Sequence, residues 1–171
     1  MISGRLTVSM ICILLGLNAC VNPFAPALSD DLLVDASGVA QQNTVDGFFK
    51  NFRYAYQFKD TLVYGKLLAD DFTFVFRDYN LGIDKSWGRA EDMLSTWGLF
   101  NGSTSCDLMW NEAVQTIGDS VLLDITRSFF LTIEINPADI IKVYGRAYIR
   151  LCRPTAEDDW KMQRWVDESN Y

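Results

Sequence analysis

Apolar residues recur every three or four positions in segments that predict three helices, and they alternate with polar residues over 71–79, 121–135 and 140–153, which predicts a sheet. Thr44 can cap the first helix, which runs to about Lys59, and Asp60 can cap a short second helix. A third helix is expected from Arg89 to Phe100. The residues expected to face the core from the second and third helices are Leu62, Leu67, Leu68, Ala90, Met93, Leu94 and Trp97.

The strand segments alternate between apolar and polar positions. Residues 71–79 and 80–87 predict a hairpin between the second and third helices. Four strands follow the third helix, over Ser105–Ile117, Val121–Ile135, Ile140–Arg153 and Trp160–Asp167. We therefore expect an α+β domain, with three N-terminal helices packed on one face of a strongly curved, mostly antiparallel sheet.

The N-terminus carries a processing signal. Residues 6–17 form a nearly unbroken apolar run that is too short to cross a bilayer, which takes about 20 residues. The following "LNAC" resembles the lipobox of bacterial lipoproteins, in which the cysteine is acylated and becomes the first mature residue; Asn18 departs from the usual Ala, Ser or Thr. The resemblance implies lipid attachment at Cys20. A plain signal peptide ending near a cysteine and an uncleaved anchor are the alternatives.

These features divide the chain into three parts. Residues 1–19 are expected to be a cleaved lipoprotein signal peptide, residues 20–43 a lipid anchor and flexible tether, and residues 44–171 the folded domain. "NPFAPA" after Cys20 is similar to the start of uncharacterised bacterial lipoproteins. Val21 stands where an aspartate would resemble an inner-membrane retention signal, so we expect the outer membrane, facing the periplasm.

Three stretches of the domain resemble the nuclear transport factor 2-like (cystatin-like, α+β cone) superfamily. They are "LLADDFTFVF", "WGRAEDMLST" and "DWKMQRWVDES", and the resemblance covers residues 44–169. That superfamily includes ketosteroid isomerases, scytalone dehydratase, polyketide cyclases and non-catalytic binding modules. The resemblance therefore implies a fold without choosing an activity.

Composition excludes several kinds of chemistry. The chain has no histidine, which removes Ser-His and Cys-His nucleophile pairs and the commonest metal ligand. Its net charge of −7, or −8 once residues 1–19 are removed, argues against nucleic acid as a partner. No zinc-site spacing and no glycine-rich phosphate loop is present, so we expect no metal and no cofactor.

Three charged residues fall in phase with the apolar face of their strands: Asp78, Arg127 and Arg164. Because a buried charge is costly unless it is paired, these groups are expected either to meet a polar or acidic ligand or to form a structural ion pair. A bulge that turns one of them outward is the other alternative. The residues of the candidate pocket are Asp78, Arg127, Arg164, Tyr56, Tyr64 and Trp97.

Two further pairs of residues concern a possible partner interface and a possible disulfide. Tyr144 and Tyr148 lie on the outer face of their strand, where the superfamily often dimerises, so this face is a candidate interface for a homodimer or an envelope protein; a solvated face covered by long side chains is the alternative. Cys106 and Cys152 are expected to remain free, because one strand separates theirs and places their Cα atoms about 10 Å apart.

These observations favour a membrane-anchored envelope lipoprotein whose domain binds a small ligand or a protein partner without catalysis. An isomerase or lyase that uses Asp78 with Tyr56 or Tyr64 is the second reading. A purely structural envelope component is the third.

Overall fold

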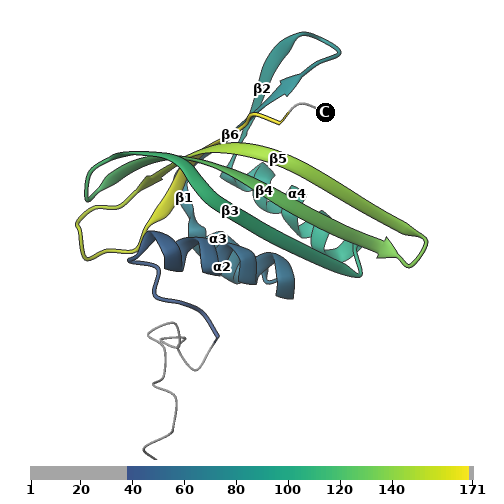
Figure 1. Ribbon diagram of the computed structural model, residues 1–171, viewed down its shortest axis with the longest axis horizontal. Coiled ribbons are helices and arrows are strands. Elements are labelled where there is room, and N and C mark those ends of the chain that lie inside the picture. The colour runs from purple at the N-terminus through teal and green to yellow at the C-terminus, as the bar shows by residue number, and fades with distance from the viewer. Residues whose placement is uncertain (1–37, 170–171) are drawn as a thin grey trace, which may run out of the picture. The chain divides into compact units, whose positions relative to one another are not determined.

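Three helices cover one face of a six-stranded sheet in the computed structural model, which describes residues 38–169 (Figure 1). The helices are α2 (Val45–Phe58), α3 (Thr61–Leu67) and α4 (Arg89–Gly102). The strands are β1 (Leu68–Asp78), β2 (Ile83–Gly88), β3 (Ser105–Gly118), β4 (Leu122–Asn136), β5 (Asp139–Cys152) and β6 (Lys161–Asp167). The expected α+β class is confirmed. The expectations on the signal peptide and on Cys20 fall outside the described residues.

Side-chain caps fix where the first two helices begin. The Thr44 hydroxyl accepts a hydrogen bond from the backbone N–H of Gly47 at 3.0 Å, which satisfies one of the free donors at the start of α2. Asp60 does the same for α3, because its carboxylate accepts from the N–H groups of Leu62 and Val63. Both predicted caps are confirmed.

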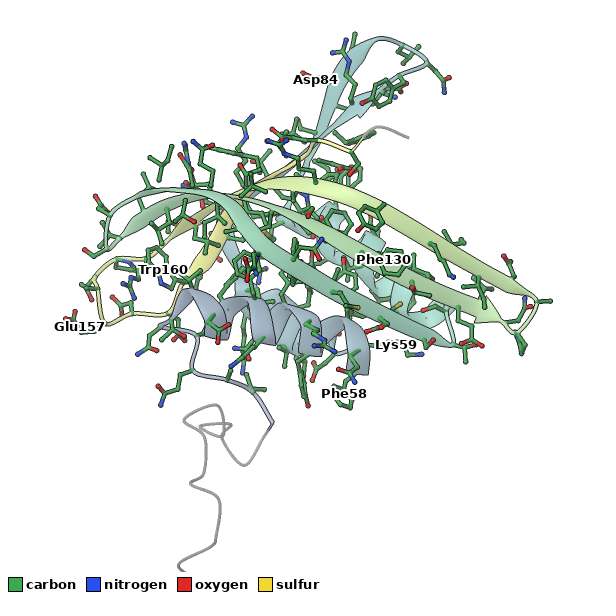
Figure 2. The ribbon with its side chains drawn as sticks, in the orientation of Figure 1. Phe58, Lys59, Asp84, Phe130, Glu157 and Trp160 are labelled. Atoms are coloured by element: carbon green, nitrogen blue, oxygen red, sulfur yellow. The ribbon has the colours of Figure 1, made fainter. Side chains whose placement is uncertain are left out.

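The strand order in the sheet is β2-β1-β6-β5-β4-β3. Strands β3 to β6 form a continuous antiparallel meander, and β6 then pairs with β1 in parallel. Because β2 and β3 end the order without pairing to each other, the sheet is open. The hairpin of β1 and β2 extends beyond the helical layer, and Figure 2 shows Asp84 on it.

Aromatic rings dominate the core between helices and sheet. Phe52 of α2 is fully buried and contacts the rings of Phe48, Tyr56, Tyr64, Trp110 and Trp165. Ring pairs of this kind add to the free energy gained by burying apolar area. The large inward side chains thus come from helices and strands far apart in the sequence.

The folded part of the chain begins before Thr44. The side chain of Asn51, buried in α2, accepts a hydrogen bond from the Ala40 N–H and donates one to the Ala40 carbonyl, at 2.7 and 2.9 Å. Gln42 donates to the carbonyl of Trp160 at 2.8 Å. Ala40 and Gln42, which were expected to belong to the tether, are therefore hydrogen-bonded to the domain. Among residues 38–169, no helix has the length and apolar character that crossing a membrane requires.

Candidate functional site

A cavity of about 260 Å³ lies between the helices and the inner face of the sheet. Six aromatic rings contribute to its wall, namely those of Tyr56, Tyr64, Phe74, Trp87, Phe129 and Trp165. Asp92 and Thr96 of α4 supply polar atoms. An apolar wall with a few converging polar groups is the usual composition of a site for a small molecule.

Two carboxyl groups line this cavity, and Asp92 is more deeply buried than the other, Asp167. Asp92 lies in the first turn of α4 and is 5% exposed. One carboxylate oxygen accepts a hydrogen bond from the Tyr64 hydroxyl at 2.7 Å, and the other accepts from the indole N–H of Trp87 at 2.9 Å. The N-terminal end of α4 adds a favourable partial charge. Three separate elements thus hold this carboxyl group in one orientation.

The surroundings of Asp92 change its acidity. Burial raises the pKa of this carboxyl group above its usual range, while the hydrogen bonds from Trp87 and Tyr64 act in the opposite direction. Burial is also the first cause that raises the pKa of Tyr64 well above its ordinary value. The Tyr64 hydroxyl therefore stays protonated and keeps donating to Asp92.

Tyr56 contributes a second hydroxyl to the same wall. Its ring packs on Phe52 and Phe100, and its side chain is 8% exposed. Among the described residues the Tyr56 hydroxyl has no hydrogen-bond partner. Burial, followed by the nearby charge of Asp92, raises the pKa of Tyr56, so this hydroxyl is also protonated. It remains available to a bound molecule.

The pocket placement expected for Asp78 is wrong, and the alternative, a structural ion pair, is what the structure has. Its side chain lies at the end of β1, outside the cavity, and forms an ion pair with Lys85 at 2.7 Å. It also accepts from the N–H groups of Asn80 and Leu81 in the hairpin turn. The hydrogen bond from Lys85 is the main reason that the pKa of Asp78 is lowered. The physical cause is that Asp78 is the last residue of β1 in a hairpin that extends beyond the helical layer (Figure 1).

The expected inward position of Arg164 is also wrong, because a bulge changes the phase of β6. On β5, Arg150 and Leu151 are neighbours, but their partners on β6 are Arg164 and Met162, which are two residues apart. This extra residue turns Arg164 outward and turns Trp165 into the core. Such a bulge is one of the alternatives that the sequence left open for these residues.

Helix α4 is rotated relative to the prediction. Its buried residues are Asp92, Thr96 and Phe100, whereas Leu94 and Trp97 are 68% and 56% exposed. The hydrogen bonds of Asp92 explain this orientation, because they draw a polar side of the helix inward. The spacing of these three buried residues, four positions apart, was the available signal. On α3, Leu62 is likewise exposed instead of buried.

Arg127 does lie on the inner face of β4, but it does not line the cavity. Its guanidinium packs over the ring of Phe49 at 4.3 Å, in a separate groove beside α2 and β3. Of the six candidate pocket residues, the structure therefore brings only Tyr56 and Tyr64 together at the cavity.

The outer face of the sheet carries both aromatic and charged side chains. Tyr144 is 71% exposed, and its ring packs beside Phe130 of β4 (Figure 2). Tyr148 is half-buried beside Arg150, which forms two hydrogen bonds with Asp124. This face thus combines ion-paired side chains with one aromatic pair, of which Tyr144 is exposed and Phe130 is half-buried.

The two thiols of the domain lie at opposite ends of β4. Cys106 pairs in register with Ile133, whereas Cys152 pairs with Leu122. This separation is far beyond what a disulfide spans, and both thiols are free. No group of three or more carboxylates and thiols within the described part of the chain is placed to hold a metal ion.

Comparisons with known proteins bear on the fold. No protein-family model matches the sequence, and the search of curated proteins gives no match either. Solved structures do match. One is a provisionally assigned scytalone dehydratase from Novosphingobium aromaticivorans, at a TM-score of 0.63 and 8% identity, over 74% of this chain and 82% of the other.

Two further structures resemble the domain. A provisionally assigned aromatic ring hydroxylase from Novosphingobium aromaticivorans matches at a TM-score of 0.60 and 13% identity, over 77% of this chain and 90% of the other. A provisionally assigned dehydratase of the nuclear transport factor 2-like family from Streptomyces avermitilis matches at a TM-score of 0.58 and 15% identity, over 72% of this chain and 91% of the other. At such low identity the likeness concerns the fold alone. The domain therefore has the nuclear transport factor 2-like fold.

Proposed function

We propose that this protein is an envelope lipoprotein whose domain binds a small, largely aromatic ligand in the cavity beside Asp92. The observation that carries the proposal is the combination of an aromatic wall with Asp92 and the Tyr56 hydroxyl, which has no partner among the described residues. A ligand with one hydroxyl group fits this chemistry, since it can donate to Asp92 and accept from Tyr56. The volume of about 260 Å³ suits one or two fused rings.

The anchoring part of the proposal depends on "LNAC". Acyl chains on Cys20 would attach the protein without a membrane-spanning helix, because two or more buried chains hold a protein stably on a bilayer. Residues 21–38 would then separate the lipid from Val39, which packs against the core. The outer membrane, facing the periplasm, stays our predicted location.

Binding of 2-naphthol to the full-length protein in detergent micelles tests the ligand site. We expect saturable binding, seen by calorimetry, that is lost in Val143→Trp, because Val143 lines the cavity and the indole would fill it. Val114→Trp is the matched control, since Val114 is 69% exposed on β3. Absence of binding, or equal binding by the two variants, would contradict the proposal.

A proton-transfer enzyme of the isomerase or lyase type is the second candidate function. One observation favours it, namely that the carboxyl group with the raised pKa lies in the same cavity as the Tyr56 hydroxyl. Asp92, and not Asp78, would then be the base. We expect deuterium to enter the α positions of the ketone 2-tetralone faster with wild type than with Asp92→Asn. Equal rates for the two proteins would exclude this role.

A further inference from the structure

A second concave site borders the aromatic core at Phe49 and Trp110 and shares no lining residue with the cavity. It is a groove of about 220 Å³ between α2 and the bulged strand β3. Four charged residues line it, namely Asp46, Lys50, Arg53 and Arg127. Asp46 and Lys50 neutralise each other in an ion pair of 2.9 Å, so the two arginines give the groove its charge of about +2.

Arg127 is held in place by two contacts, neither of which is made with an anion. Its guanidinium lies over the ring of Phe49, and its Nε–H donates to the Asn111 carbonyl at 2.7 Å. The register of β3 shifts beside Ala113, the partner of Arg127, and this irregularity presents that carbonyl. Both contacts fix the plane of the guanidinium, which is the arrangement that suits bidentate binding of an oxyanion.

Neither Arg127 nor Arg53 forms an ion pair with a described residue. Arg127 is half-buried, and burial lowers its pKa, although the charges of Asp46 and Glu112 act in the opposite direction. A half-buried cation that forms no ion pair is unfavourable, so it is a natural place for an anionic ligand. This cluster stands out in a chain whose net charge is −7.

We propose that the groove between α2 and β3 binds a phosphate group, with Arg127 as its oriented ligand and Arg53 as a second cation. A phosphomonoester carries about two negative charges, which match the two arginines. The phosphate belongs either to a soluble molecule or to a lipid headgroup. The site is separate from the cavity that contains Asp92.

Titration of the full-length protein in detergent micelles with inorganic phosphate, at constant ionic strength, tests the proposal. Trp110 lines the groove, so its fluorescence reports on binding, and calorimetry gives the affinity. We expect saturable binding that is at least about tenfold weaker in Arg127→Gln, which corresponds to the loss of one charged hydrogen bond. Arg53→Gln, an exposed change that leaves the core intact, should also weaken binding.

Arg164→Gln is the matched control, because Arg164 is exposed on β6 and outside the groove. Val143→Trp should also leave phosphate binding unchanged, which separates this site from the cavity. Tighter binding of dihexanoyl phosphatidic acid than of phosphate would assign a lipid headgroup, and the reverse order a soluble phosphate. No saturable binding in the millimolar range, or equal affinities for Arg53→Gln and Arg164→Gln, would overturn the proposal.

Discussion

The hydrogen bond between Tyr64 and Asp92 should contribute measurably to folding. Tyr64→Phe removes the hydroxyl that donates to Asp92 at 2.7 Å and leaves the ring, which is 1% exposed, in its place. The carboxylate then keeps only the donor from Trp87. Because Asp92 is buried, water does not readily replace the missing donor.

The size of this effect follows from the charge of the acceptor. A hydrogen bond to a charged group contributes about 1.5–3 kcal/mol, so Tyr64→Phe should lower the free energy of unfolding by about 2 kcal/mol at neutral pH. For a chain of this size, that loss lowers Tm by about 4–8 °C. The loss should shrink at acid pH, because a protonated Asp92 forms a weaker, neutral hydrogen bond.

Tyr56→Phe is the matched control. Both tyrosines are buried and their rings are 6.0 Å apart, but the Tyr56 hydroxyl has no partner among the described residues. Its removal should therefore change the free energy of unfolding by less than about 0.5 kcal/mol. Urea unfolding followed by circular dichroism, at two pH values, measures both variants. Equal losses in the two variants would refute the assignment of the Asp92 hydrogen bond.

Three further predictions follow from the same contacts. Burial raises the pKa of Asp92 above its ordinary value of 3.8. The contribution of this group to stability is therefore fully present below pH 3.8 and is lost as the pH rises through the pKa of the folded state. Urea unfolding across this pH range should show wild type losing stability relative to Asp92→Asn, and parallel curves would contradict this. Gly145→Ala should destabilise the fold by at least about 2 kcal/mol, because a Cβ there would lie 2.2 Å from the Phe129 ring. Gly98→Ala in α4 should stabilise it by about 0.5–1 kcal/mol, because a Cβ at Gly98 has no atom within contact distance. Tm shifts of the same sign for the two variants in thermal unfolding would refute this. Cys20→Ser should abolish acyl labelling and release the protein from membranes, and persistent labelling would exclude the anchor.

The helix starts could be predicted because their causes are local. Thr44 and Asp60 each bond to N–H groups two or three residues later, and a short window of sequence contains both partners. The strands could be predicted for a similar reason, because the alternation of apolar and polar residues is visible within each segment. The start of the folded part could not be predicted from a short window of sequence, because Ala40 is hydrogen-bonded to Asn51, eleven positions further along the chain.

The candidate site was harder to predict because its causes are not local. The phase of β6 changes at a bulge against β5, which moves Arg164 out and Trp165 in without any mark in the local pattern. Asp92 was missed because a polar residue on a helix is usually exposed. Its burial depends on Tyr64, from an element 28 positions earlier in the chain.

A crystal structure of the protein with bound 2-naphthol is the most direct test of the central claim that this cavity is a ligand site. We predict the two rings between the aromatic side chains, with the naphthol oxygen within hydrogen-bond distance of both Asp92 and the Tyr56 hydroxyl. A cavity closed by inward movement of Trp87 or Trp165, or the naphthol bound only on the outer sheet face beside Tyr144, would contradict the account.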